Sequence, residues 1–325
     1  MRFSRRSILL VALAVLTACV ALRPAAALDY PNRPVRIVVG FPAGGQQDIM
    51  ARLLGQWLSE RLGQQFLVEN RSGAGGNIGA EVVINSPPDG YTLLLVGSPN
   101  AINATLYEKL NFVFLRDIVP VASFARTPLV IEVHPSVPVK TLSEFIAYGK
   151  ANPGKVNYAS AGNGSPQHVS AELFKIMTGV NMVHVPYRGA APALVDMLAG
   201  QVQVMIDPLP ASIEFVRTGR LRPLAVTSAA RWPALQNVPT ATELIPGYVA
   251  ESWYGAGVPR NTPTEIVDKL NREINAGLAN AKIAERIVEL GAYVVTGSPA
   301  DFGKMVADET EKWGKVVKAS GAKAE

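Results

Sequence analysis

The sequence predicts an α/β fold in which mostly parallel sheets are flanked by helices and shared between two domains. After residue 30, short β-branched or apolar segments alternate with amphipathic helical segments. Near-continuous apolar strands separated by helices are typical of parallel sheets covered on both faces. The chain has 325 residues, 48% hydrophobic and 18% charged. This suits a large core, and the length is too great for one small domain.

The first predicted strand, VRIVV at 35–39, is rich in β-branched residues, and the helix predicted at 49–62 carries apolar residues on one face. Further strands are predicted at 66–68, 92–96, 129–131, 183–185, 202–206 and 224–226, with helices at 78–84 and from 166 to about 177. The sequence shows no internal repeat and no low-complexity linker. We therefore expect short crossovers between the domains.

Several helix ends carry their own signals. Thr141 and Thr262 each precede a glutamate by three positions, as in a capping box, and Pro263 is expected at the first helical position. Ser298 repeats the pattern with an aspartate. Gly179 and Gly291 are expected to end helices, because glycine adopts the left-handed conformation found there.

Charge and cysteine content exclude several classes of protein. The formal net charge is +5, but residues 1–27 contain four arginines and no acid, which leaves 27 Lys and Arg against 26 Asp and Glu. A nucleic-acid-binding protein would need a basic stripe. Cys19 is the only cysteine, which excludes a disulfide scaffold, and the three scattered histidines lack metal-ligand spacing. We therefore predict neither a metal nor a cofactor.

The first 27 residues have the pattern of an export signal. Three arginines precede an apolar run of 15 positions, which is shorter than a membrane-spanning helix, and three alanines end at Ala27. Cleavage after Ala27 is predicted, so that the mature protein is exported to the periplasm. Arg5-Arg6 also fits twin-arginine export, and Cys19 stands in a lipobox-like sequence that offers a lipid anchor as an alternative.

The segment from Phe41 to Asp48 joins a predicted buried strand to a helix through Pro42, Ala43, Gly44 and Gly45. Glycines let backbone N–H groups approach a ligand, and a helix N-terminus attracts negative charge. The turn is therefore a candidate anion site, placed where open α/β sheets hold ligands. The alternatives are that Gly44-Gly45 is only a tight turn and that Asp48 only stabilises the first helical turn.

Other turns supply further candidate ligand-binding residues. Ser98 and Asn100 follow the strand at 92–96, and Tyr187 follows the strand at 183–185. Asp207 follows an apolar strand and is either a hydrogen-bond acceptor for a ligand or a cap of the next helix. A second glycine-rich helix start contains the following candidates: Ser160, Gly164, Ser165 and His168.

Ser165 and His168 also suggest an esterase-like hydrolase. The serine is one place late for G-x-S-x-G, and no carboxylate is identifiable by motif as the partner of the histidine. We therefore predict no catalytic residues and no enzyme activity.

One family resemblance runs in order through nearly all of residues 30–320. It is carried by Tyr30-Pro31-x-Arg33-Pro34, Phe41-Pro42-x-Gly44-Gly45-x-x-Asp48, Asn70-Arg71-x-Gly73-Ala74-Gly75-Gly76, Pro88-Asp89-Gly90-Tyr91, Tyr158-Ala159-Ser160-x-Gly162-x-Gly164-Ser165 and His184-Val185-Pro186-Tyr187-x-Gly189. In these motifs the chain resembles the Bug-type (TctC-like) periplasmic substrate-binding proteins of tripartite tricarboxylate transporters. Ala43, Gln46-Gln47 and 111–114 depart from the family pattern.

The resemblance implies a periplasmic-binding-protein (Venus-flytrap) fold with lobe 1 at 29–128 plus 249–325 and lobe 2 at 129–248. It implies that a small carboxylate is held largely through backbone groups and water at Phe41–Asp48, with Ser160, Gly164, Ser165 and His168 facing it from the other lobe. The expected partners are this solute and the membrane permease subunits, with a membrane sensor as the alternative. We expect a monomer.

Overall fold

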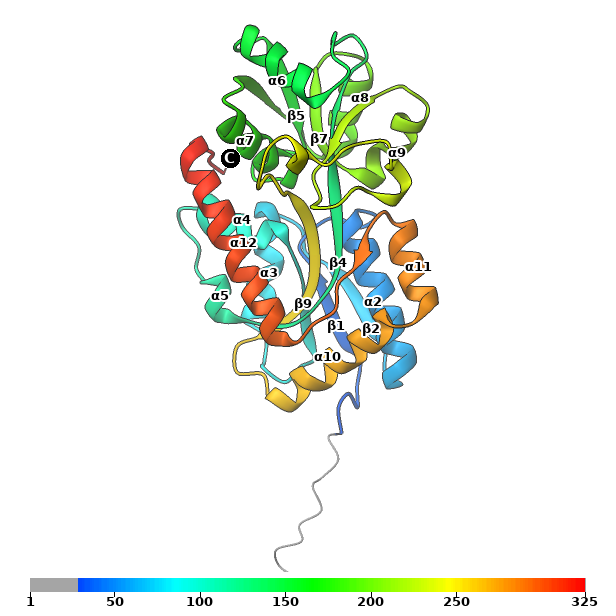
Figure 1. Cartoon of the computed structure of the whole chain (residues 1–325). Coiled ribbons are helices and arrows are strands. Elements are labelled where there is room, and N and C mark those ends of the chain that lie inside the picture. The colour runs from blue at the N-terminus through cyan, green and yellow to red at the C-terminus, as the bar shows by residue number, and fades with distance from the viewer. Residues whose placement is uncertain (1–28, 325) are drawn as a thin grey trace, which may run out of the picture.

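The computed structural model describes residues 29–324; the signal and the Cys19 anchor predicted within 1–27 lie outside them. Two lobes lie one above the other, and β4 runs through both (Figure 1). The described strands are β1 (Val35–Val39), β2 (Phe66–Asn70), β3 (Thr92–Gly97), β4 (Ile118–Val133), β5 (Val156–Ser160), β6 (Met182–Pro186), β7 (Val204–Pro208), β8 (Arg222–Val226), β9 (Glu251–Pro259) and β10 (Tyr293–Val294). The described α-helices are α2 (Gln46–Leu62), α3 (Asn77–Ile84), α4 (Ser98–Leu106), α5 (Phe114–Asp117), α6 (Leu142–Ala151), α7 (Pro166–Thr178), α8 (Ala190–Leu198), α9 (Leu209–Arg217), α10 (Thr264–Leu278), α11 (Ala281–Glu289) and α12 (Pro299–Ser320).

Lobe 1 is built on the strand order β2-β1-β3-β9-β4, with β10 also paired to β4. β1 pairs in parallel with β2 and β3, whereas β9 is antiparallel to both β3 and β4. Helices α2 and α11 lie on one side of this sheet, and α3, α4 and α12 lie on the other (Figure 1).

Lobe 2 continues the same sheet through β4 in the order β8-β4-β7-β5-β6. β5 pairs in parallel with β6 and β7, whereas β4 is antiparallel to β7 and β8. The predicted two-lobed α/β fold is confirmed, with parallel pairing inside each strand-helix series. Every antiparallel pair of the described strands involves β4, which runs through both lobes, or β9, which follows the return of the chain into lobe 1.

The two chain crossings are hydrogen-bonded to each other where they pass between the lobes. β4 pairs with β9 over 118–128 and with β7 and β8 over 129–133. The chain returns between β8 and β9, where Thr227 N donates to Leu129 O at 2.9 Å and Ala250 N donates to Thr227 O at 3.1 Å. The two chain connections between the lobes are therefore held to each other by backbone hydrogen bonds.

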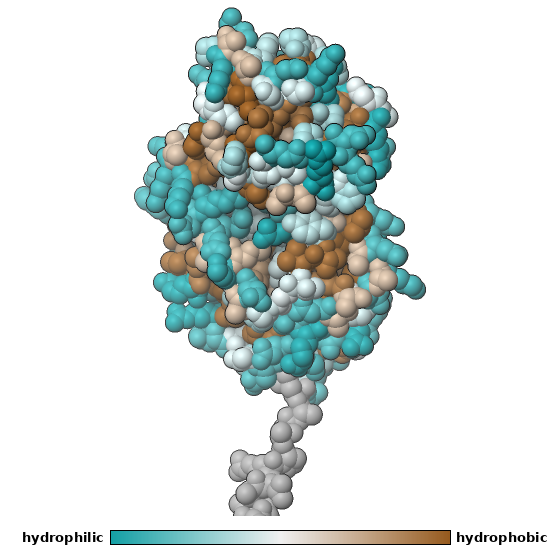
Figure 2. Space-filling view, in the orientation of Figure 1, coloured by the Kyte–Doolittle hydropathy of each residue, from teal (hydrophilic) through white to brown (hydrophobic). Residues whose placement is uncertain are grey.

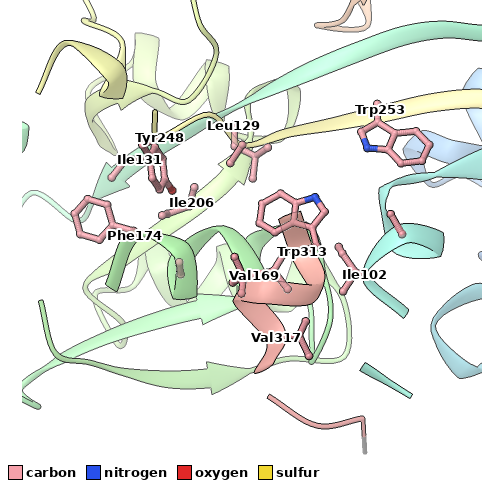
Figure 3. Packing of buried hydrophobic residues seen from close by; sticks show 14 of the residues in the cluster. Ile102, Leu129, Ile131, Val169, Phe174, Ile206, Tyr248, Trp253, Trp313 and Val317 are labelled. Carbon is pink, nitrogen blue, oxygen red and sulfur yellow. The ribbon is translucent and has the colours of Figure 1, made fainter. Parts of the chain in front are cut away.

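The hydrophobic core extends across the junction. Trp253 of β9 and Trp313 of α12 belong to one buried cluster with side chains of both lobes. Figure 3 shows Trp313 between Ile102 of α4 and Val169 of α7, which belong to lobes 1 and 2. A second cluster fills the other face of the lobe 1 sheet, beneath α2, α10 and α11.

Most of the predicted helix ends are found. Thr141 and Ser298 cap α6 and α12 through their hydroxyls, and Gly179 ends α7 in the left-handed conformation at φ 73°. The capping box predicted at Thr262 is wrong. Pro263 is the N-cap of α10, and the Thr262 hydroxyl instead donates to Pro259 O at 2.8 Å.

The strand predicted at 129–131 is the far end of a 16-residue strand. Its first part carries no clear strand signal, because prolines and polar residues interrupt the apolar pattern at 118–128. Within the described residues, none of the helices combines the length and apolar character that crossing a bilayer requires.

Candidate functional site

The carboxyl ends of the parallel strands in both lobes face the junction. β4 runs from lobe 1 into lobe 2, and β9 is antiparallel to it, so β1, β2 and β3 all run toward lobe 2. By the same reasoning β5, β6 and β7 run toward lobe 1. Turns that follow these strands therefore lie at the position where open α/β sheets bind ligands.

The turn from Phe41 to Asp48 is organised by the Asp48 carboxylate. Gly44 N donates to Asp48 Oδ2 at 2.9 Å, Arg52 donates two hydrogen bonds at 2.9 Å each, and Asn70 Nδ2 donates at 3.0 Å. Asp48 is only 2% exposed, and these bonds, led by those from Arg52, lower the pKa of its carboxyl. The carboxylate is therefore an internal brace of the turn.

The backbone beside this brace remains open. Ala43, Gly44 and Gly45 are exposed, Gly44 has φ 81°, and Gly45 is the N-cap of α2 without a side-chain cap. Gly44 N is already bound to Asp48 Oδ2, so the attraction for an anion comes from the other N–H groups at the start of α2. Asn70 Nδ2 also donates to Phe41 O at 2.9 Å, which fixes the entrance to the turn.

The Phe41 ring is held by a close approach of two backbones. A Cβ at Gly76 would lie 2.9 Å from Phe41 Cε2, and a Cβ at Gly40 would lie 2.7 Å from Gly76 Cα. Glycine is therefore required at both positions, because any side chain would push the ring or the neighbouring turn away.

Ser98 and Asn100 shape the start of α4. Ser98 Oγ accepts a hydrogen bond from Trp253 N at 3.0 Å, and Asn100 Oδ1 accepts one from Gly97 N at 2.9 Å. Both side chains are buried. Gln47 of α2 is close by, since its Nε2 would lie 3.2 Å from a Cβ at Gly97. The starts of α2 and α4 thus lie side by side.

Four predicted residues of lobe 2 lie together at the start of α7. Ser165 is the N-cap, and its Oγ accepts from His168 N at 3.3 Å. Gly164 N donates to His168 Nδ1 at 3.1 Å. Ser160, at the end of β5, has its Oγ 2.6 Å from Nε2 of His184.

The two histidine rings form a stack. Their centroids are 4.1 Å apart with planes 6° apart, and His184 also stacks on Tyr158 at 4.7 Å. Burial lowers the pKa of each imidazole to about 4, so both are neutral at pH 7. Because His168 Nδ1 accepts the Gly164 N–H, its proton is on Nε2, which makes that nitrogen a hydrogen-bond donor.

The side chains of Tyr187 and Asp207 form hydrogen bonds within lobe 2. The Tyr187 hydroxyl donates to Asp196 Oδ2 at 2.7 Å, while its backbone N donates to Ser160 O at 3.0 Å. Asp207 has no exposed surface and accepts from Gln167 Nε2 at 3.1 Å and from the Ser212 hydroxyl at 3.0 Å. Burial raises the pKa of Asp207 to about 6.

Turns from the two lobes meet at Asn103 of α4. Its Nδ2 donates to Gly75 O at 2.8 Å and to Asn77 Oδ1 at 3.1 Å. A Cβ at Gly164 would lie 3.8 Å from Asn103 Oδ1 and 2.2 Å from Leu106 Cδ2. The glycine-rich turns of lobes 1 and 2 are therefore packed against the same helix.

A cavity of about 740 Å³ lies elsewhere between the lobes and contains none of the predicted residues. It is bordered by α9, the segment 228–234, Glu251 and 288–293. Figure 2 shows apolar surface near β10, just below the junction of the lobes. Arg217 and Arg231 on its border are paired with Glu214 and Glu243. Both border arginines therefore already have a carboxylate partner.

Sequence reasoning missed two residues that the fold brings to these turns, Asn103 and His184. Asn103 stands in a helix without any motif. Gln46, identified in the sequence only as a departure from the family pattern, donates from Nε2 to Thr127 Oγ1 at 3.1 Å. The valines on both sides of His184 in the sequence favour a histidine buried in the hydrophobic core. In the structure its ring instead stacks on His168, beside the start of α7. The signal for His184 is the register of β5 and β6, which places it opposite Tyr158. Among residues 29–324, no group of three or more His, Cys, Asp or Glu side chains is placed to hold a metal ion.

A family model, curated relatives and solved structures match this chain. A family model described as "Tripartite tricarboxylate transporter family receptor" matches residues 50–322. Protein BugT of Bordetella pertussis is 39% identical, over 98% of each chain. Rpa4515 of R. palustris, solved with adipate, is 42% identical with a TM-score of 0.82, covering 91% of this chain and 99% of its own. MatC of Rhodopseudomonas palustris, with bound malate, is 33% identical with a TM-score of 0.78, covering 89% and 100%.

Proposed function

The chain belongs to the tripartite tricarboxylate transporter receptor family, and we propose that it captures a small dicarboxylate between its lobes and delivers it to the permease of such a transporter. The observation that supports the proposal is that the glycine-bearing turns before α2 and α7 follow β1 and β5, two strands whose carboxyl ends point toward the junction from opposite lobes. Adipate and malate, bound by two relatives of similar structure, are both dicarboxylates.

In the proposed site, one carboxylate is held by the backbone N–H groups of Ala43 and Gly45, with Phe41 beside it, while the bond from Gly44 N to Asp48 braces the turn. The other lobe contributes the start of α7, where the Ser165 hydroxyl and the Nε2–H of His168 supply neutral donors, while Gly164 N holds the imidazole in place by its bond to Nδ1. Neutral donors suit an anion that must also be released, because they attract it without a buried cation. The proposed binding set is completed by Ser98, Asn100, Ser160, Tyr187 and Asp207. The last two act through neighbours, since Tyr187 N donates to Ser160 O and Asp207 accepts from Gln167 Nε2.

We further propose that 29–128 with 249–325 and 129–248 move as near-rigid lobes about the junction. The contacts Gly164–Leu106 and Gly291–Pro210 join the lobes in the present arrangement, which we assign to the solute-holding state. Residues 1–27 serve as the export signal, and the mature receptor acts as a monomer in the periplasm.

The receptor performs no catalysis in this proposal. The Ser165 hydroxyl accepts from the His168 backbone, and His168 Nδ1 accepts from Gly164 N. Nδ1 is the atom that a carboxylate would orient in a hydrolase triad. The two side chains are therefore bonded as a helix cap and a wall of the site.

The test is titration of the purified protein with adipate, malate and the monocarboxylate hexanoate by calorimetry. We expect saturable binding of a dicarboxylate with no product formed. Gly45→Val should abolish binding without unfolding, because Gly45 has an ordinary φ of −76° and its nearest neighbour to a Cβ is 3.5 Å away. Ala281→Val, at the exposed start of α11, is the control. Retained affinity in Gly45→Val would remove this turn from the site.

A further inference from the structure

A chain of buried polar side chains runs from the start of α7 into lobe 2. Gln167 Nε2 lies 3.1 Å from Asp207 Oδ1, Asp207 Oδ2 lies 3.0 Å from Ser212 Oγ, and Ser212 Oγ lies 2.6 Å from Glu132 Oε1. Gln167 is 4% exposed, and the other three side chains have no exposed surface. Four elements, α7, β7, α9 and β4, are thereby tied together behind the proposed solute site.

The two contacts of Ser212 with Glu132 and Asp207 each need a proton between the oxygens. If both carboxyl groups were ionised, the serine hydroxyl would supply only one of these two protons. The Ser212 hydroxyl has a single proton, yet its oxygen is within hydrogen-bond distance of both Glu132 and Asp207. Asp207 has a second donor in Gln167. Glu132 has none among the described residues, and its Oε2 is buried without a partner. The additional proton therefore belongs on Glu132, which donates to Ser212, which in turn donates to Asp207.

The surroundings of Glu132 offer no cation, among the described residues, that would favour the ionised form. Its neighbours in register are Met205 of β7 and Pro223 of β8. The charged side chains of α9, Glu214 and Arg217, are exposed and paired with each other.

On β8, Arg222 donates to the backbone carbonyls of Val137 and Val139. Asp207 is thus the charge that acts on Glu132, and burial together with this carboxylate raises the pKa of Glu132 well above its ordinary value.

We propose that protonated Glu132 and Ser212 are positioning residues for solute binding, acting through Asp207 on Gln167. This inference rests on the proposed function, since Gln167 stands in the first turn of α7 between Ser165 and His168. The chain fixes the side chain of Gln167 and keeps a single negative charge behind the site. Loss of the Glu132 proton would place two adjacent carboxylates behind a bound anion and leave Ser212 with one proton for two acceptors.

The test compares Glu132→Gln with Glu132→Leu. The glutamine amide still donates to Ser212, so we expect adipate affinity within about threefold of the wild type. Leucine removes the donor and leaves the chain incomplete, which should weaken binding about tenfold. The affinity of the wild type should fall at alkaline pH as Glu132 ionises, and Glu132→Gln should abolish that fall. Equal losses in both variants, or the same alkaline fall in Glu132→Gln, would overturn the positioning role.

Infrared difference spectroscopy of the solute-free protein tests the proton separately. We expect the carbonyl stretch of a protonated, buried carboxylic acid at pH 7, shifted in D₂O and absent from Glu132→Gln. A missing band refutes protonated Glu132 while leaving the receptor proposal intact. A wild-type protein that shows the band and binds no carboxylate refutes the proposed function and, with it, the positioning role.

Discussion

Gly291 and Pro210 touch across the two lobes, and this contact allows lobe closure to be tested without altering the proposed site. Gly291 follows α11 in lobe 1, and Pro210 is in the first turn of α9 in lobe 2. A Cβ at Gly291 would lie 2.3 Å from Pro210 Cγ and 3.1 Å from two further ring atoms. Carbon atoms in contact are ordinarily about 3.5 to 4.0 Å apart, so Gly291→Ala requires a movement of more than about 1 Å.

Neither side of this contact adjusts easily. The proline ring is rigid, and the Gly291 backbone is held by its N–H bond to Val288 O at 2.8 Å. We therefore expect the lobes to separate at this edge. Overpacking of this kind costs about 1 to 3 kcal/mol. Because opening relieves it, the penalty falls on the solute-holding arrangement, and adipate affinity should drop about 5- to 150-fold.

Gly219→Ala is the matched control. Gly219 also follows a helix, has φ 71° against 70° for Gly291, and has no atom within 4 Å of the position that an added Cβ would take. Both variants lose about 1 to 2 kcal/mol of unfolding free energy from the left-handed backbone. Calorimetric titration and urea unfolding of both proteins give the comparison. Equal affinities in the two variants would refute the closure argument.

Three further predictions concern stability. Trp313 is 2% exposed between the lobes, so Trp313→Ala should lower the unfolding free energy by about 3 to 5 kcal/mol; a loss below about 1 kcal/mol in urea unfolding would contradict this packing. The pKa of His168 is lowered to about 4 by burial and by Lys175, so the neutral ring contributes to the unfolding free energy above about pH 6.5. This contribution is lost as the pH falls toward 4, and the loss is roughly 2 kcal/mol at pH 5. His168→Gln should flatten this part of the curve of unfolding free energy against pH. The pKa of Asp207 is raised to about 6 by burial, so its contribution to the unfolding free energy is present below about pH 4 and is lost as the pH rises through 6. Between pH 4.5 and pH 8 the unfolding free energy of Asp207→Asn should therefore rise by about 2 kcal/mol relative to that of the wild type. A difference between the two proteins that does not change with pH would disprove the shift.

Much of the fold follows from local patterns in the sequence. The strand at 35–39 is found with the predicted bounds, and the helix after Ser298 begins at the predicted cap, because β-branched runs and cap residues act over a few neighbours. The first half of β4 is not predictable in this way, since its pairing with β9 joins residues more than a hundred positions apart. Such a pairing has no signature in the strand itself.

The candidate site is predictable in outline and not in its bonds. Glycine-rich helix starts mark Gly44, Gly45 and Gly164 in the sequence alone, since the glycines and the helix period are local features. The hydrogen bonds of Asp48 with Asn70 and the stack of His168 on His184 join different strands and helices. These partners decide that the Asp48 carboxylate braces its turn and that Nε2 of His168 carries the proton.

The strand-helix alternation, the glycine turns and the family resemblance can all be read from the amino-acid sequence, because each is written in residues that are neighbours along the chain. Folding adds two facts that no local pattern contains: the Gly164 turn packs on α4 of the other lobe, and Glu132 and Asp207 share one serine. The physical reason is burial, since a side chain's charge state and partners depend on groups that only the folded sheet brings within about 3 Å of it.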